Sequence, residues 1–196
     1  MDIGIDLDGV IYNSENWFMA FGEVYDINNN GKGIVDSTTN NFQKRYGLSD
    51  EKAKEIRLKY LPIQMKESPL MPFVKEVLKL LKQNHNLFII TSRGSVANEH
   101  IEITKQKLKE DKIDVDEVIF SQESKLNICR QKKIDLMIDD SFNVVKELSE
   151  NNIKCLQFNA DNTKCVTNEN VIIVHNWGEV YRQITILDKE SKNEKM

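Results

Sequence analysis

Ile5-Asp6-Leu7-Asp8-Gly9-Val10, near the start of this 196-residue chain, closes an apolar run with two carboxylates. In an extended strand Asp6 and Asp8 lie on the same face, and a turn at Gly9 would direct both into the crevice at the end of a sheet. Burying two carboxylates together is costly, so a nearby cation or a functional role is expected. The alternative is an ordinary Asp-Gly turn whose acids are solvated.

Five further apolar runs follow, and helical patterns lie between them. The runs are rich in Ile, Val and Phe and mostly lack alternating polar residues, which is typical of strands buried on both faces of a parallel sheet. The sequence therefore predicts an α/β fold, a Rossmann-like parallel sheet with helices on both faces. The expected strands are 3–6, 87–91, 118–120, 136–138, 153–158 and 171–174. The expected helices are 72–84, with Pro72 at the first helical position, 96–110, 142–150 and 177–186.

The gap between the first two strands is about sixty residues longer than a strand–helix–strand unit needs. We therefore expect a small helical cap inserted after the first strand, at the edge of the sheet where open α/β folds bind ligands. Its expected helices are 17–25, 42–46 and 53–61, with Gly47 as a stop and Ser49 or Asp50 as a start. The expected division is a core of 1–11 and 71–187, a cap of 12–70 and a charged tail of 188–196.

The composition argues against several function classes. Because 31 acidic and 27 basic side chains leave a net charge of −4, the chain lacks the basic balance of a nucleic-acid binder. No apolar run approaches the ~18 residues of a membrane helix, and the first residues lack the basic start of a signal peptide. Three sparse cysteines (Cys129, Cys155 and Cys165) favour reduced thiols. We expect a cytoplasmic protein without a nucleic-acid polymer or a membrane as partner; the oligomeric state stays open.

Two more acids, Asp139 and Asp140, close the apolar run 136–138. One of them could instead cap the helix expected at 142–150. Parallel strands end at the same edge of a sheet, so two strands that each end in an acid pair would bring their carboxylates together. Such an all-oxygen site suits Mg²⁺.

Phosphate-binding residues are expected at the same edge. Thr91-Ser92-Arg93-Gly94 follows the second strand, and a hydroxyl with backbone N–H groups at such a turn can hold phosphate oxygens. Lys125 follows the third strand, where a helix should begin, and could neutralise a phosphate or buried carboxylates. On position alone it is more often a solvated surface lysine, in which case Lys132 and Lys133 are the alternatives.

In their order along the chain these motifs resemble the haloacid dehalogenase-like hydrolase superfamily. The matching motifs are Asp6-Leu7-Asp8-Gly9-Val10, Thr91 in Ile89-Ile90-Thr91-Ser92-Arg93, Lys125 and Asp139-Asp140. The resemblance extends over the whole chain apart from the insertion and the tail. The resemblance implies an aspartyl-phosphate enzyme with Asp6 as nucleophile and Asp8 as general acid and then base. An acid at the position of Asp8 points to phosphatases or phosphomutases, because dehalogenases and phosphate-pumping ATPases lack it.

The resemblance also implies the ligands of the site. Thr91 and Lys125 would bind the transferring phosphoryl group. Ser92 is a further candidate because it lies in the same turn, and Arg93 could either touch the substrate phosphate or pair with a cap acid. Asp6, the backbone carbonyl of Asp8, and Asp139 would hold Mg²⁺, with Asp140 assisting directly or through water. A small helical cap implies a small phosphorylated metabolite as the substrate.

Within the superfamily the chain is most similar to the 5'(3')-deoxyribonucleotidases, which dephosphorylate nucleoside monophosphates. It departs from them at Ile11-Tyr12-Asn13-Ser14, where that family has an Asp–aromatic pair. The sequence therefore does not establish that this chain has the nucleoside pocket of that family. Trp17 could stack on a base, with Phe18 and Phe21 beside it, or belong to the core of the cap. The alternatives are a sugar-phosphate phosphatase or phosphomutase, and a non-catalytic domain that binds a phospholigand.

Overall fold

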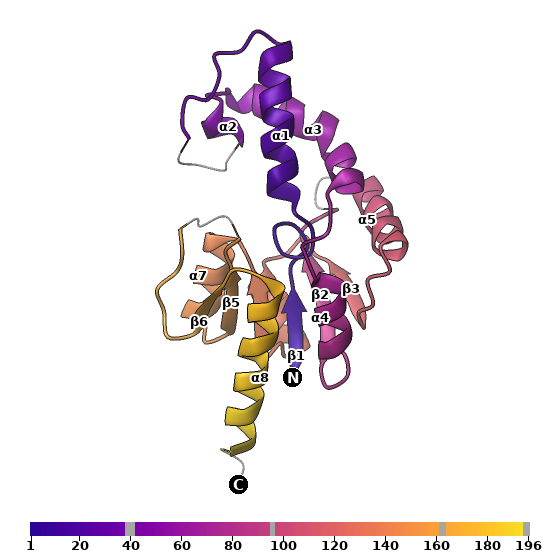
Figure 1. Cartoon of the computed structure of the whole chain (residues 1–196), viewed down its shortest axis with the longest axis vertical. Helices are drawn as coiled ribbons and strands as arrows, with labels where there is room; N and C mark the ends of the chain where they lie inside the picture. The colour runs from indigo at the N-terminus through magenta and orange to yellow at the C-terminus, as the bar shows by residue number, and fades with distance from the viewer. Residues whose placement is uncertain (38–41, 95–96, 161–163, 194–196) are drawn as a thin grey trace.

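The computed structural model describes residues 1–37, 42–94, 97–160 and 164–193 (Figure 1). Six parallel strands form one sheet in the order β3-β2-β1-β4-β5-β6, which confirms the predicted α/β fold. Each strand lies within one residue of its predicted bounds. The strands are β1 (Asp2–Ile5), β2 (Asn86–Thr91), β3 (Glu117–Phe120), β4 (Leu136–Asp139), β5 (Lys154–Phe158) and β6 (Val171–Val174).

The register of the central strands brings their carboxyl ends to one edge. Ile5 at the end of β1 is opposite Ile89 of β2 on one side and Ile138 of β4 on the other. The next residue, Asp6, donates its backbone N–H to the carbonyl of Ile138 at 2.9 Å. Asp6 therefore lies beside Asp139, the last residue of β4.

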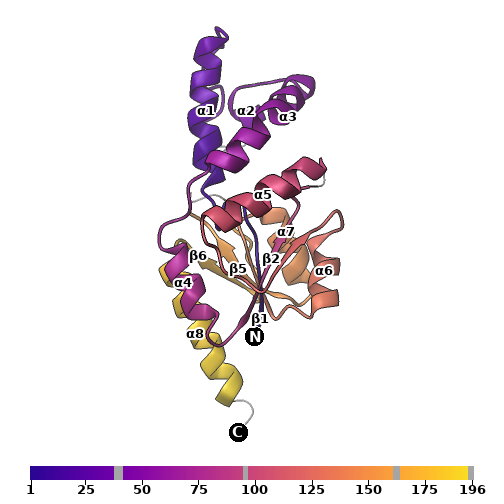
Figure 2. The same cartoon turned by 90° about the vertical axis from the view of Figure 1, so that its right-hand side faces the viewer.

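Helices cover both faces of the sheet, as predicted (Figure 2). On one face α4 and α8 pack on each other and bury the side chains of Ile3, Ile5 and Leu87. On the other face α6 and α7 enclose Ile90 and Met137. The bounds are α4 (Val74–Leu81), α5 (Asn98–Glu110), α6 (Lys125–Lys132), α7 (Phe142–Glu150) and α8 (Trp177–Asn193).

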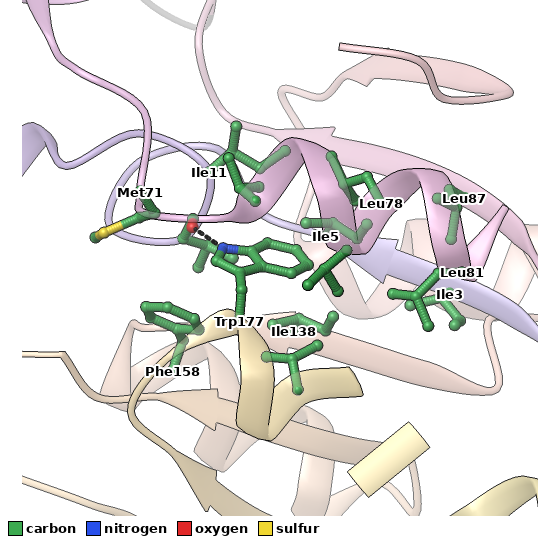
Figure 3. Packing of buried hydrophobic residues seen from close by; sticks show 14 of the residues in the cluster. Ile3, Ile5, Ile11, Met71, Leu78, Leu81, Leu87, Ile138, Phe158 and Trp177 are labelled. Atoms are coloured by element: carbon green, nitrogen blue, oxygen red, sulfur yellow. Dashed lines mark hydrogen bonds between the residues drawn. The ribbon is translucent and has the colours of Figure 1, made fainter. Parts of the chain in front are cut away.

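Trp177 connects the first turn of α8 to the loop after β1 (Figure 3). Its buried indole donates its N–H to the carbonyl of Val10 at 2.9 Å, and its ring lies 6.1 Å from that of Phe158. A buried indole N–H needs such a partner. The hydrogen bond thus holds the loop that carries Asp8 against the core.

The insertion forms α1 (Ser14–Asn28), α2 (Phe42–Arg45) and α3 (Asp50–Glu67), which stand beyond the carboxyl ends of the strands (Figures 1 and 2). Two adjacent segments join it to the sheet. The N–H of Asn13 donates to the carbonyl of Pro69, and that of Met71 to the carbonyl of Ile11, each at 2.8 Å. These contacts lie at the predicted boundaries near 12 and 70, and the division into cap and core stays a prediction. The three helices pack around Phe42, Tyr46 and Ile56, with Phe21, Tyr25, Leu48 and Tyr60 against them.

The helix α4 starts two residues later than predicted, whereas α3 starts where it was expected. α4 begins at Val74 and not at Pro72, because Phe73 takes a left-handed conformation (φ 63°) and serves as the N-cap. α3 begins as expected, with Ser49 accepting the N–H of Lys52 at the N-cap.

The helix α8 ends later than predicted, and the described part of α5 starts at Asn98. α8 continues to Asn193, through the first residues of the expected tail 188–196. α5 begins at Asn98, and residue 96, where a helix was expected to start, lies outside the described residues. Among the described helices, none is long and apolar enough to span a bilayer.

Candidate active site

Three carboxylates gather at the carboxyl edge of the sheet. Asp6 follows β1, Asp139 ends β4, and Asp140 comes next. One oxygen from each lies within 4.8 Å of the other two. Asp6 and Asp139 are buried, and the N-cap of the following helix is Ser141, not either of the acids. Asp139 still assists that helix start, because its Oδ1 accepts the N–H of Ser141 at 2.9 Å.

Lys125 lies between two of these carboxylates. It opens α6, and its Nζ is 2.7 Å from Oδ1 of Asp6 and 2.6 Å from Oδ2 of Asp139. Only 11% of its side chain is exposed, so it is not a solvated surface lysine. The ammonium group neutralises part of the charge that β1 and β4 bring together.

The two alternative lysines lie elsewhere. Lys132, at the other end of α6, pairs with Glu117 at the start of β3, with Nζ 2.7 Å from Oε2. Lys133 is exposed and takes a left-handed conformation at the C-cap of α6. Neither is placed beside the acidic cluster.

The pKa values of the cluster are shifted by burial and by the charges that it brings together. Burial raises the pKa of Asp6, although the charge of Lys125 opposes the rise. Burial also raises the pKa of Asp140, and the charges of Asp6 and Asp139 add to the effect. Burial alone would lower the pKa of Lys125, but the attraction of Asp6 and Asp139 outweighs it and the pKa is raised. Lys125 therefore offsets only part of the repulsion among the three acids.

Gly9 lets the loop after β1 approach Asp140. Its φ is 76°, a conformation that glycine adopts without strain. A Cβ on Gly9 would lie 2.1 Å from Oδ2 of Asp140, closer than two atoms can pack. This position therefore excludes any other residue while Asp140 keeps its place.

Thr91 ends β2 at the same edge of the sheet. Its side chain is buried, and Oγ1 accepts the backbone N–H of Arg93 at 3.1 Å. Ser92 is exposed. The structure places both hydroxyls at the strand-to-helix turn where a phosphate was expected, and contact with a phosphate stays a prediction.

The Asp8 side chain is held by Arg93. Nε of Arg93 donates to Oδ2 of Asp8 at 2.8 Å, and Nη2 donates to Oδ1 at 2.6 Å. Burial acts to raise the pKa of Asp8, but the hydrogen bonds and charge of Arg93 outweigh it and the pKa is lowered. Arg93 thus pairs with an acid of the loop after β1, and not with an acid of the insertion.

A cavity of about 910 Å³ lies between the insertion and the edge of the sheet. Asp8, Gly9 and Asp140 line it from the sheet side. The insertion lines it with aromatic, apolar and cationic side chains, which are Phe18, Phe42, Lys54, Arg57, Leu58 and Leu61. Such a volume is typical of pockets for small organic ligands.

Trp17, the predicted stacking residue, is not among the described residues that line this cavity. Its ring stacks on Phe21 with 5.3 Å between centroids, and its indole donates to Oε2 of Glu67 at 3.0 Å. The neighbouring Phe18 does line the cavity. One position along α1 turns a side chain by about 100°, so adjacent aromatics face different surroundings.

Gln64 is a candidate that the sequence pattern did not single out. It is buried on α3, lines the cavity, and brings Nε2 to 3.5 Å from Oδ1 of Asp8 and 2.7 Å from the Ser68 hydroxyl. The available signal was its helical spacing from Arg57 and Leu61, which places a polar residue on the cavity side of α3.

The acidic cluster fits a magnesium ion. Its donors are carboxylate oxygens, the ligands that Mg²⁺ prefers, and no cysteine or histidine joins the cluster among the described residues. The Asp8 side chain lies outside the cluster, which leaves its backbone carbonyl as the ligand expected from that residue.

No family model matches the chain. A protein of Clostridium acetobutylicum named as a nucleotidase is 28% identical over 193 residues, which are 98% of this chain and 97% of that protein.

Solved structures share the fold over nearly the whole chain. A haloacid dehalogenase-like family hydrolase from Streptococcus pneumoniae has a TM-score of 0.64 at 17% identity, covering 93% of this chain and 97% of that one. A predicted phosphatase from Clostridium acetobutylicum has a TM-score of 0.63 at 19% identity, with coverage of 93% and 97%. A Bacillus subtilis structure, described as bound to magnesium, has a TM-score of 0.58 at 16% identity, with coverage of 92% and 96%.

Proposed function

We propose that this chain, which has the haloacid dehalogenase-like hydrolase fold, is a Mg²⁺-dependent phosphomonoester hydrolase that acts through an aspartyl-phosphate. The observation that carries the proposal is the cluster of Asp6, Asp139 and Asp140, in which Lys125 pairs with Asp6 and Asp139 and Asp140 lines a large cavity. The relative named as a nucleotidase and the structure described as a phosphatase support it.

Asp6 is the nucleophile in this proposal. Its carboxylate oxygen forms a bond to phosphorus while the ester P–O bond breaks, which divides hydrolysis into two displacements. The negative phosphate repels Asp6, so the ammonium group of Lys125 has to offset this repulsion as it already does for Asp6 and Asp139. Asp6, Asp139, Asp140 and the backbone carbonyl of Asp8 would hold Mg²⁺, which supplies charge stabilisation to the phosphoryl oxygens.

Asp8 carries the protons. In its protonated form it donates one to the oxygen of the leaving alcohol. The carboxylate so formed, which is the form that Arg93 favours, then takes one from the water that attacks the aspartyl-phosphate, and Asp6 is released as a carboxylate with inorganic phosphate. Its place at the cavity wall, next to Gly9 and Asp140, supports this assignment. Thr91 and Ser92 would hold the phosphoryl oxygens through hydroxyl and backbone N–H groups.

We further propose that the substrate is a nucleoside monophosphate. The cavity exceeds the space that a phosphate needs, and Phe18 lines it with an aromatic ring on which a base could stack. Lys54 and Arg57 of α3 line the cavity and could pair with the phosphate, although Glu15 and Asp50 of the insertion line it as well. Arg57, Leu61 and Gln64 of α3 line the cavity, so the insertion would limit the access of bulk water during attack.

The test is phosphate release from a panel of nucleoside monophosphates and sugar phosphates, with Mg²⁺ and with EDTA. Mg²⁺-dependent release confined to nucleotides is the expected result, and Asp6→Asn should abolish it. Asp114→Asn, an exposed aspartate paired with Lys82, is the matched control and should keep full activity. Release from sugar phosphates alone would retain the mechanism but discard the nucleotidase assignment, and no release from any ester would favour the phospholigand-binding alternative.

A further inference from the structure

Arg93 has no surface left for a substrate. Its residue is only 4% exposed, and it is not among the described residues that line the cavity. Nε and Nη2 are both committed to the Asp8 carboxylate, at 2.8 and 2.6 Å. A phosphate could reach this guanidinium only by displacing Asp8 from it.

The remaining faces of the guanidinium are also occupied. Nη1 lies 3.5 Å from the hydroxyl of Thr104 on α5, and the guanidinium carbon lies 5.4 Å from the centre of the Tyr12 ring. Tyr12 is itself fully buried, and its hydroxyl donates to Oδ2 of Asp111 at 2.9 Å. Arg93 is thus fixed from α5 and from the loop after β1, on the side of Asp8 that faces away from the cavity.

The Asp8 side chain, by contrast, is 39% exposed and lines the cavity. A two-point contact between a planar guanidinium and a planar carboxylate fixes rotation of the carboxylate as well as its position. A single point charge does not fix this rotation. Gln64 of α3 approaches Oδ1 of the same carboxylate at 3.5 Å, so Asp8 is contacted from both the sheet side and the insertion.

We propose that Arg93 is a positioning residue that acts through Asp8 and does not bind the substrate phosphate. The inference rests on the proposed function, since it takes Asp8 to exchange protons with the leaving group and with water. In this arrangement Arg93 orients the Asp8 carboxylate toward the cavity, and its removal leaves phosphate binding intact while the proton-transfer geometry is lost.

The test is a double-mutant cycle with Arg93→Met and Asp8→Asn, measured with a nucleoside monophosphate. Arg93→Met alone should lower kcat by about 10- to 100-fold, the scale expected when a catalytic group is misplaced. In the Asp8→Asn background the same change should lower kcat by less than about twofold, because residues that act as a unit are not additive. Losses that multiply across the cycle would overturn the inference.

Binding is measured separately by calorimetric titration of inorganic phosphate in the presence of Mg²⁺. The dissociation constant of Arg93→Met should stay within about twofold of wild type, and weakening by about tenfold or more would identify Arg93 as a phosphate ligand and overturn the inference. Arg130→Met, an arginine on α6 that donates to Asn151, is the matched control and should change neither quantity.

Two further measurements distinguish loss of the Arg93–Asp8 contact from misfolding of the variant. Near-UV circular dichroism and the melting temperature establish that Arg93→Met is folded, and Arg93→Lys, which keeps the charge without the two-point contact, should show the same lowered kcat. If the wild type releases no phosphate from any ester, both the proposed function and this inference are wrong. If the wild type releases phosphate and Arg93→Met releases it at the same rate, the inference is wrong and the proposed function is retained.

Discussion

The ammonium group of Lys125 lies 2.7 Å from the Asp6 carboxylate, where the start of α6 meets the end of β1. Both side chains are almost fully enclosed, with 11% and 13% of their surfaces exposed. An ion pair in such surroundings cannot lose one partner without leaving the other charge buried.

Lys125→Met should therefore impair both activity and stability. We expect phosphate release to fall at least about 100-fold, because a charge that faces the developing phosphoryl charge is lost. The free energy of unfolding should fall by about 3 kcal/mol, as for other broken buried pairs. Lys132→Met, which removes an exposed pair with Glu117, should cost less than about 1 kcal/mol and leave activity unchanged. Equal effects of the two substitutions in urea unfolding and activity assays would contradict the role of Lys125.

Mg²⁺ should stabilise the protein more at alkaline pH than at acid pH. Burial raises the pKa of Asp6 to about 7, and burial with neighbouring charge raises that of Asp140 to about 9. For acids with raised pKa values, ionisation destabilises the metal-free protein as pH rises through these values, whereas Mg²⁺ binds the ionised form. Asp8 has a lowered pKa, so its contribution is lost only at more acid pH.

The measurement is the rise in melting temperature on adding Mg²⁺, at about pH 6 and about pH 8.5. The rise should be larger at the higher pH, and Asp139→Asn should remove it at both. A rise that is the same at both pH values would show that Mg²⁺ does not bind the Asp6 and Asp140 carboxylates.

Gly9→Ala should disturb the acidic cluster more than a glycine substitution elsewhere. A methyl group there meets Oδ2 of Asp140 at 2.1 Å, so either the loop or Asp140 has to move. Gly33 is the matched control, because its φ is 77° and a Cβ at that position meets no atom within 4 Å. Both alanine variants should lose about 1–2 kcal/mol from the positive φ alone, as urea titration would show. Only Gly9→Ala should also weaken Mg²⁺ binding, and equal Mg²⁺ affinities would refute the close approach.

Phe18→Ala should raise the Michaelis constant for nucleotides by about 5- to 150-fold, the range that corresponds to the usual energy of base–aromatic stacking. Trp17→Ala should leave that constant unchanged and lower the melting temperature, because its ring contacts Phe21 and Glu67 and not the cavity. The reverse pattern in steady-state kinetics would restore Trp17 as the stacking residue.

Asp8→Asn should affect substrates according to their leaving groups. An alkyl phosphate needs a proton on its leaving oxygen, whereas p-nitrophenyl phosphate releases a stable anion. We expect kcat/KM to fall about 100-fold or more with a nucleoside monophosphate and markedly less with p-nitrophenyl phosphate. Equal losses with the two substrates would argue against Asp8 as the general acid.

Much of the fold and the order of the site motifs were predictable from the sequence. Buried parallel strands require nearly continuous apolar runs, and this local requirement placed β1, β2 and β4 within one residue. Because parallel strands end at one edge, the pattern of apolar runs and acids was enough to predict that Asp6 and Asp139 meet. A helix was also expected to begin near Lys125, because this residue follows the third strand of a strand–helix alternation.

The partners of individual side chains could not be predicted, because they depend on how helices rotate and pack against neighbours distant in the sequence. The packing of α6 places Lys125 beside Asp6, and it places Lys132 beside Glu117 of β3. The choice between Trp17 and Phe18 depends on the surface that α3 presents to α1.

Local patterns and the geometry of parallel strands thus account for the sheet, the insertion point and the residue types at the carboxyl edge, all of which can be derived from the amino-acid order. The pairing of Arg93 with Asp8, and the approach of Gln64 to the same carboxylate from α3, arise only when the separate elements pack together. The physical reason is that a buried charge is satisfied by whichever groups this packing brings within hydrogen-bond distance.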